Sequence, residues 1–220
     1  MTRSRRHRAR RGGFSTAEVL AGTSLGLILA ASLYSFQQAQ LKAFAAQNVY
    51  SDSQNVTRTA LDLMVRELRM ACYDPTGALP KSPGPSCPQV PEGVIQATPT
   101  SLRFKQDLDG DGLFTGAGED VTYDLSNGDL RRTDGTAQPV PLVSGVPSSG
   151  LSLRYFDGSN PPVELVPAGS PPALTQGQRD CVTKVQITVT ANLTNPRAAT
   201  PIASVAESEV AIRNRSLMNF

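Results

Sequence analysis

The chain has 220 residues, of which 39% are hydrophobic and 18% charged, and this composition excludes a largely disordered protein. It holds 21 Lys and Arg against 19 Asp and Glu, but six Arg stand in the first 13 residues, and without them the balance is 15 to 19. A basic nucleic-acid-binding domain is therefore not expected, and no nucleic acid is inferred as a partner. His7 is the only His, which excludes His-dependent triads and multi-His metal sites elsewhere.

Proline and glycine divide the chain into two parts. All 17 Pro lie at or after Pro75, and residues 14–74 contain only Gly22 and Gly26 as glycines. Such a stretch predicts one long helix over residues 14–72, which the turn residues 75–77 then terminate.

The first part of this helix is apolar enough to cross a membrane. Residues 14–36 read FSTAEVLAGTSLGLILAASLYSF and carry one charge, Glu18. They span roughly 35 Å as a helix, against about 30 Å for a hydrocarbon core. The preceding Arg residues predict a single pass with a cytoplasmic N-terminus. A carboxylate within the bilayer costs about 3 kcal/mol or more, so Glu18 is a functional-site hypothesis.

Other interpretations of this segment stay open at this point. A secretory signal peptide would be cut near residues 30–32, although Glu18 is unusual for that class. Twin-arginine export has the Arg pair but lacks apolar residues after it. A plain membrane anchor leaves Glu18 unexplained.

The segment Gly13-Phe14-Ser15-Thr16-Ala17-Glu18-Val19-Leu20 resembles the type IV prepilin signal of pilins and type II secretion pseudopilins. The resemblance implies a leader over residues 1–13, which the prepilin peptidase removes after Gly13. It also implies N-methylation of Phe14 and an assembly role for Glu18, the fifth residue of the mature chain. The implied location is the bacterial inner membrane, and later an extracytoplasmic filament.

Physical chemistry suits these three positions. Gly13 has no side chain, so the scissile peptide can lie extended in a protease groove. Phe14 would leave an apolar N-terminus in the membrane. Glu18 lies one helical turn from the new amine, and in an assembly it could pair with the amine of a neighbouring subunit.

The second part of the helix, residues 37–72, is expected to be amphipathic and to lie on a globular domain. Apolar residues recur broadly at helical spacing. Residues 61–70 are expected to be its buried end, with Arg66 and Glu67 on a solvated face. The recurring apolar residues are Leu41, Phe44, Val49, Val56, Leu63 and Leu68.

Residues 73–220 are predicted to form a β-rich domain. Apolar and polar residues alternate over 102–105, 121–125, 151–155 and 185–190, and more weakly over 205–212. Turn residues separate these runs, which indicates an antiparallel sheet with one buried face. The predicted fold class is α+β, with a pilin-like long N-terminal helix packed on a C-terminal antiparallel β-sheet domain.

Two further segments resemble a narrower group. Residues 119–132 are similar to the strand–turn–strand of PilW-type minor pilins and GspJ-type pseudopilins. Residues 69–77 resemble the helix exit of PilW-type proteins, in which a Gly often stands where this chain has Cys72.

Three Cys allow three pairings, each leaving one thiol. Cys72 and Cys87 flank a Pro-rich segment, and joining them would contribute about 3 kcal/mol by loop entropy. A Cys72–Cys87 disulfide is favoured, and pairing of Cys181 with either partner, or no disulfide, stays open.

The segment Asp107-Leu108-Asp109-Gly110-Asp111-Gly112 matches the first half of an EF-hand calcium loop. The second half departs, because Gly118 stands at position 12 and the acids Glu119 and Asp120 follow. A polar hairpin loop is the competing interpretation. If calcium binds, Asp107, Asp109 and Asp111 are the expected ligands, with Glu119 or Asp120 as a further one. No other cofactor is expected.

The function expected from the leader is that of a minor pilin of a type IV pilus, with prepilin peptidase and other pilins as partners. A type II secretion pseudopilin is the alternative within the class. A membrane-anchored extracytoplasmic ligand-binding protein or enzyme is the alternative from another class, although no catalytic constellation supports an enzyme.

Overall fold

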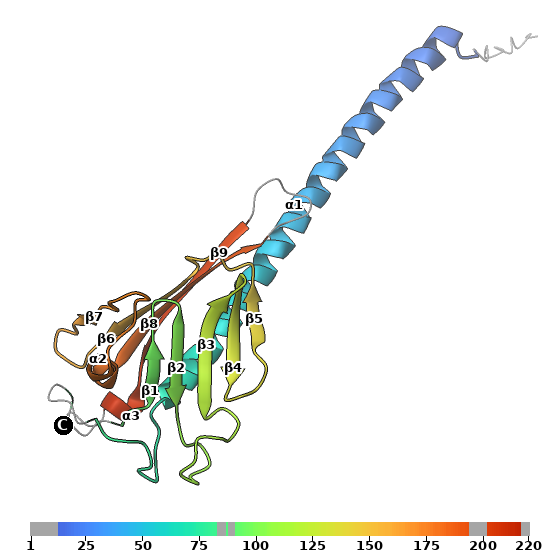
Figure 1. Ribbon diagram of the computed structural model, residues 1–220. Coiled ribbons are helices and arrows are strands. Elements are labelled where there is room, and N and C mark those ends of the chain that lie inside the picture. The colour runs from blue at the N-terminus through green and yellow to red at the C-terminus, as the bar shows by residue number, and fades with distance from the viewer. Residues whose placement is uncertain (1–12, 83–86, 88–90, 194–201, 217–220) are drawn as a thin grey trace, which may run out of the picture. The chain divides into compact units, whose positions relative to one another are not determined.

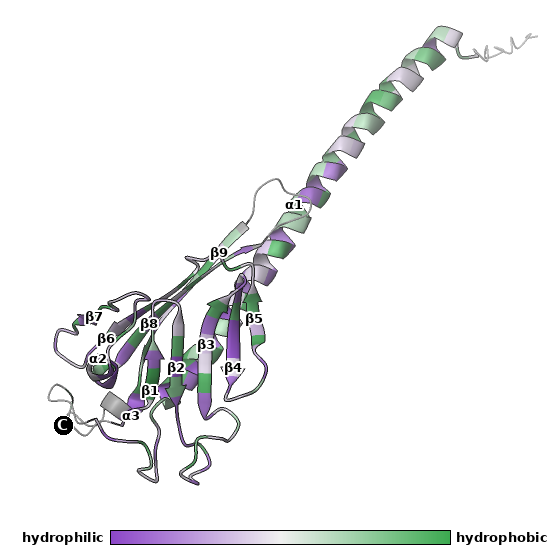
Figure 2. Ribbon diagram, in the orientation of Figure 1, coloured by the Kyte–Doolittle hydropathy of each residue, from purple (hydrophilic) through white to green (hydrophobic). Residues whose placement is uncertain are grey.

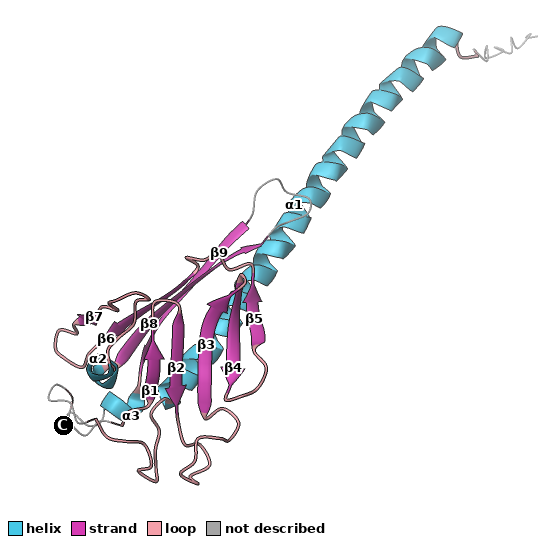
Figure 3. Cartoon of the chain, viewed as in Figure 1, coloured by secondary structure: helices cyan, strands magenta, loops and turns pink. Residues whose placement is uncertain are grey.

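The computed structural model describes residues 13–82, 87, 91–193 and 202–216 (Figure 1). The predicted α+β class is confirmed: a long N-terminal helix precedes antiparallel sheets (Figure 3). Apart from Gly13, the basic leader lies outside the described residues. The elements are α1 (Thr16–Met70), β1 (Val94–Ala97), β2 (Ser101–Lys105), β3 (Asp120–Ser126), β4 (Asp129–Asp134), β5 (Val140–Ser144), β6 (Leu151–Phe156), β7 (Glu164–Leu165), α2 (Gln176–Cys181), β8 (Lys184–Leu193), β9 (Ile202–Ala211) and α3 (Arg213–Ser216).

The chain divides into two units, Met1–Ala45 and Ala46–Phe220. In the described part of the first unit, every side chain of residues 13–44 is exposed. By length and composition α1 can cross a membrane, and hydrophobic colours follow its first part in Figure 2. An exposed apolar surface of this length marks a membrane or protein contact.

The second unit contains two antiparallel sheets, with strand orders β1-β2-β3-β4-β5 and β7-β6-β8-β9. The expectation of a single sheet is therefore wrong. The alternating runs correspond to β2, β3, β6, β8 and β9. Sequence alternation does not identify β1, β4, β5 or β7, because the β1–β2 and β4–β5 pairs have register shifts and β7 has two residues. β4 begins within residues 119–132, where only the resemblance predicted a second strand.

A single apolar core joins the end of α1 to both sheets. Met64 and Leu68 are fully buried one turn apart within the expected buried end of the helix, residues 61–70. The buried face of the helix already begins at Ser53, however, and Met70 is exposed. Phe104 and Tyr155 contribute aromatic rings from the two sheets to the same cluster. Each such side chain contributes roughly 1.5–3 kcal/mol through burial.

The helix ends before the predicted Pro75 turn. Cys72 has a left-handed backbone (φ 61°), and its N–H donates to the Lys105 carbonyl at 2.9 Å. A residue in this conformation commonly ends helices and is most often Gly. A Cβ on Gly93 would lie 2.5 Å from Cys72 Sγ, so Gly93 has to be a glycine for this packing.

The expected Cys72–Cys87 disulfide is wrong, because the structure joins Cys87 to Cys181 at the end of α2. Their Cα atoms are 5.4 Å apart, whereas Cys72 lies buried against Gly93. The loop-entropy argument for a Cys72–Cys87 bond concerns the unfolded chain and does not consider where the fold places each Cys. The observed bond closes a loop of 94 residues, for which the same argument gives about 4.7 kcal/mol.

Glu67 is half-buried and does not lie on a solvated face as predicted, whereas Arg66 is exposed as predicted. The Tyr123 hydroxyl donates to Glu67, and Arg132 Nε donates to both Glu67 carboxylate oxygens at 3.0 Å. Burial and then the Glu67 charge raise the pKa of Tyr123 well above its ordinary value. These bonds attach α1 to β3 and β4.

Replacing Glu67 with Ala should lower the free energy of unfolding by about 2 kcal/mol, because it removes the acceptor of the half-buried Arg132 and Tyr123. The matched control Arg66→Ala, one residue away and exposed, should change it by no more than about 0.5 kcal/mol. Urea unfolding of the full chain in detergent, followed by circular dichroism, measures both. Equal effects of the two variants would contradict this role of Glu67.

Candidate functional site

The segment that resembles a cleavage site lies directly before the long helix. Gly13 and Phe14 precede the start of α1 at Thr16, and no heavy atom lies within 4 Å of a Cβ placed on Gly13. Phe14 is 82% exposed. The peptide bond between the two residues is thus non-helical and accessible, as a protease requires. Glu18 lies in the first turn of α1 and is exposed.

A second candidate site is the acidic loop, residues 106–119, which connects β2 to β3. The Gln106 N–H donates to the Glu119 carbonyl at 2.9 Å and closes the base of the loop. The Asp107 N–H donates to the Tyr73 carbonyl at 2.7 Å. The position of the loop is therefore fixed by the residues that follow α1.

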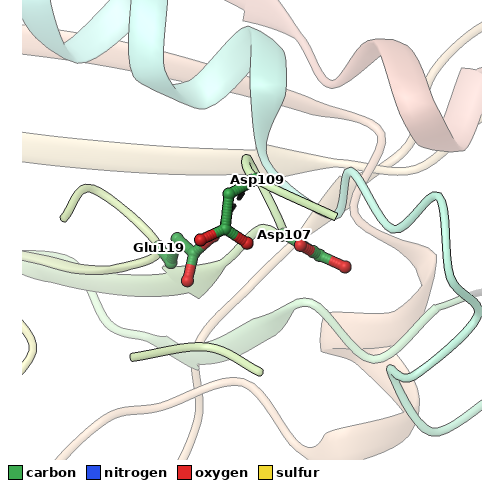
Figure 4. A group of neighbouring side chains, drawn as sticks. All are labelled: Asp107, Asp109 and Glu119. Carbon is green, nitrogen blue, oxygen red and sulfur yellow. Dashed lines mark hydrogen bonds between the residues drawn. The ribbon is translucent and has the colours of Figure 1, made fainter. Parts of the chain in front are cut away.

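Three carboxylates gather in this loop. Asp107, Asp109 and Glu119 each place an oxygen within 4.8 Å of the others (Figure 4). Asp107 and Glu119 are buried, and Asp109 is exposed. Of the predicted ligands, Asp111 is not in this group, because its exposed carboxylate accepts the Leu113 N–H at 2.7 Å.

Asp120, the other acid considered as a ligand, also lies outside the group. Its carboxylate accepts two hydrogen bonds from Arg103, at 2.8 and 2.6 Å. Hydrogen bonding to Asp120 is the main reason why the pKa of Arg103 is raised above its ordinary value. Asp120 therefore stabilises the β2–β3 pair.

Neutral donors satisfy the two buried carboxylates. Asp107 accepts the Gly110 N–H at 2.7 Å and the Thr76 hydroxyl at 2.9 Å. Glu119 accepts the N–H groups of Leu108 at 2.9 Å and Gly116 at 2.7 Å. Within the described ranges, no basic side chain makes an ion pair with either carboxylate.

The arrangement fits a hard cation such as calcium, which prefers carboxylate and carbonyl oxygens. Three carboxylates supply part of the six to eight oxygens that calcium takes, and water completes many such sites. Gln106 adds a buried amide at the loop base: its Nε2 donates to the Gly118 carbonyl at 2.6 Å. Its Oε1 has no hydrogen bond to any described residue.

Sequence reasoning missed Thr76 and Gln106. Thr76 stands 31 residues before the carboxylate that it contacts, so no local spacing indicates the contact. Gln106 directly precedes the first acid of the motif, and this position was the available signal.

No protein-family model matches this chain, and no curated protein matches it. Among solved structures, the chain is similar to a type IV-like pilin from Thermus thermophilus, with 12% sequence identity and a TM-score of 0.38. The match covers 73% of this chain and 97% of that chain. A likeness at this level assigns no function, so the functional proposal has to rest on the residues of this chain.

Glu119→Gln should open the acidic loop, because an amide presents one acceptor oxygen where the carboxylate presents two to the Leu108 and Gly116 N–H groups. We expect a loss of about 2 kcal/mol in unfolding free energy and faster hydrogen exchange at these amides. The control Asp111→Asn makes the same charge change at an exposed position and should leave both amides protected. Unchanged exchange in Glu119→Gln would contradict the assigned role.

Proposed function

We propose that this protein is a minor pilin of a type IV pilus. The supporting observation is the Gly13–Phe14 bond in exposed, non-helical chain immediately before an apolar helix. In this proposal the prepilin peptidase cuts that bond at the bacterial inner membrane, and Phe14 becomes N-methylated. The protein then leaves the membrane and joins major and minor pilins in an extracytoplasmic filament, with a structural rather than an enzymatic role.

The same observation fits a type II secretion pseudopilin, and the PilW-type likeness of residues 69–77 favours the pilus. The left-handed backbone at Cys72, where those proteins often have Gly, supports this choice. Loss of the gene should impair pilus assembly and leave protein secretion unchanged. The opposite pattern would favour the pseudopilin.

Gly13→Glu should block processing, because a charged side chain at the scissile position does not fit a groove shaped for Gly. The matched control Gly13→Ala adds only a methyl group, so a larger share of this variant than of Gly13→Glu should be processed to the mature chain. Mass spectrometry of the mature N-terminus measures both variants. A mature chain that begins after Ala31 would instead identify an ordinary secretory signal.

Glu18→Ala should permit cleavage and impair assembly. Proteolysis acts on the bond after Gly13, whereas Glu18 is needed when the amine of a neighbouring subunit enters an apolar core. Ser24→Ala, at another exposed position of α1, is the control and should assemble normally. Immunoblots of sheared filaments and membranes give the distribution of each variant, and normal incorporation of Glu18→Ala would refute the pairing.

We also propose that the acidic loop binds calcium through Asp107, Asp109 and Glu119. The gathering of these three carboxylates, two of them buried without a basic partner in the described chain, supports the proposal. An incomplete ligand set of this kind belongs to the weak extracellular class, with dissociation constants of about 10⁻⁴ to 10⁻³ M.

Calcium at ten times its dissociation constant should stabilise the chain by about 1.4 kcal/mol and raise its melting temperature by roughly 3–6 °C relative to EDTA. Asp109→Asn should abolish this rise. Asp111→Asn is the matched control, because it lies in the same loop but outside the carboxylate group, and it should retain the rise. Calorimetry of the full chain in detergent measures these melting temperatures. A calcium-dependent rise of less than about 1 °C in the unmodified chain would contradict calcium binding and favour the interpretation of the loop as a solvated turn.

A further inference from the structure

The four outermost strands of the two sheets differ in how they are protected. β1 and β7 have four and two residues, and β5 carries Pro141. Short strands and prolines prevent another chain from pairing with a sheet edge. β9 has ten residues, no Pro and an unbroken register with β8 along its whole length. Among the outermost strands of the described sheets it is the longest, and charged side chains take the place of a Pro or a short length.

The residues of β9 whose backbone faces the outer edge follow from the ladder. The Thr190 N–H donates to the Gly150 carbonyl on the β6 side, so the backbone N–H and C=O of Thr190 point away from β9. In an antiparallel pair, residues that exchange both hydrogen bonds alternate with residues that point away. Val189 therefore bonds to its partner Ala206, and the N–H and C=O of Val205 point to the outer edge.

The same alternation turns the backbone groups of Glu207 and Glu209 to the outer edge. No backbone group of another described element bonds to β9 along this edge. Val205 is 64% exposed, and Ala206 and Ser208 on the inner face stay half-buried. Along the described chain the edge thus presents backbone donors and acceptors that bond to no other element, beside the exposed Val205 side chain. Such an edge is a template for an added strand.

Two carboxylates lie beside this edge. Glu207 and Glu209 stand two residues apart on the exposed face of β9. Their described side-chain partners are Gln186 and Lys184 of β8, each bonded to one carboxylate oxygen. The second oxygen of each carboxylate accepts no hydrogen bond in the described chain. The pKa of Arg154 on β6 is raised mainly by its hydrogen bond to Glu164, and the charge of Glu207 also helps to raise it. Opposite charges in directly facing positions of paired strands attract, and like charges repel.

We propose that the outer edge of β9 binds an extended segment of another protein as an added antiparallel strand, with Lys or Arg at the two positions facing Glu207 and Glu209. The β9 strand of a second copy is a poor occupant, because pairing two β9 strands would bring four carboxylates together on one face. This inference does not depend on processing at Gly13 or on assembly through Glu18.

The test uses the full chain in detergent and a fluorescein-labelled seven-residue peptide in which Lys alternates with Thr. The alternation places Lys on one face of an extended strand. A peptide with the Lys grouped at one end has the same composition and net charge and controls for diffuse attraction. A third peptide alternates Glu with Thr. Fluorescence anisotropy reports binding at low salt.

Val205→Pro removes one N–H from the outer edge and leaves the ladder with β8 intact, and Val205→Thr is the matched control that keeps the N–H and the branched shape. We expect saturable binding of the alternating Lys peptide alone, weakened about tenfold by Val205→Pro and unchanged by Val205→Thr. Glu207→Gln with Glu209→Gln should weaken binding about fivefold. This second variant keeps the test valid if Val205→Pro unfolds.

Three results would overturn the proposal. The first is equal binding of the alternating and grouped Lys peptides, which would mean diffuse attraction. The second is no binding of the alternating peptide at millimolar concentration. The third is self-association of the chain that Val205→Pro abolishes, which would make a second copy the occupant. None of these results bears on whether the chain is cleaved after Gly13.

Discussion

The folded unit depends on one face of α1 near its C-terminal end. Met64 and Leu68 lie fully buried in the one apolar cluster to which both sheets also contribute, so the helix end and the two sheets share a single core. The half-buried contact of Glu67 with Arg132 lies beside this face and fixes the rotation of the helix on β4. A rotation of one residue would bury the charged Arg66 in place of Glu67 and lose the pair.

The end of α1 also determines where the acidic loop lies. Cys72 and Tyr73 follow the helix and bond to the backbone of Lys105 and Asp107. Because Cys72 is left-handed, the chain turns toward β2 at once and brings Thr76 within 2.9 Å of the Asp107 carboxylate. The geometry of the acidic loop is thus a consequence of how the helix stops, and a change at Cys72 would alter a site 35 residues later in the chain.

Sequence patterns revealed the features that depend on neighbouring residues. The absence of Pro predicted the long helix, and alternation predicted strands such as β8. Features that depend on distant residues were not predicted. The partner of Cys87 depends on where α2 places Cys181, and Glu67 differs from the exposed Arg66 only because β4 supplies Arg132. The acids of the loop were identified from spacing, but Asp111 accepts the N–H of its own turn.

Two glutamates of α1 illustrate why the folded unit and the N-terminal segment need different partners. Glu67 lies next to the fully buried Leu68 and forms an ion pair with Arg132 within its own chain. Glu18 interrupts a long apolar stretch, and no described residue forms an ion pair with it. A carboxylate in apolar surroundings is stable only when it is paired or neutralised. Once the apolar helix leaves water, Glu18 must therefore either take up a proton or gain a countercharge from outside the described chain, and under the proposed function the amine created by cleavage after Gly13 in a neighbouring subunit would supply that countercharge.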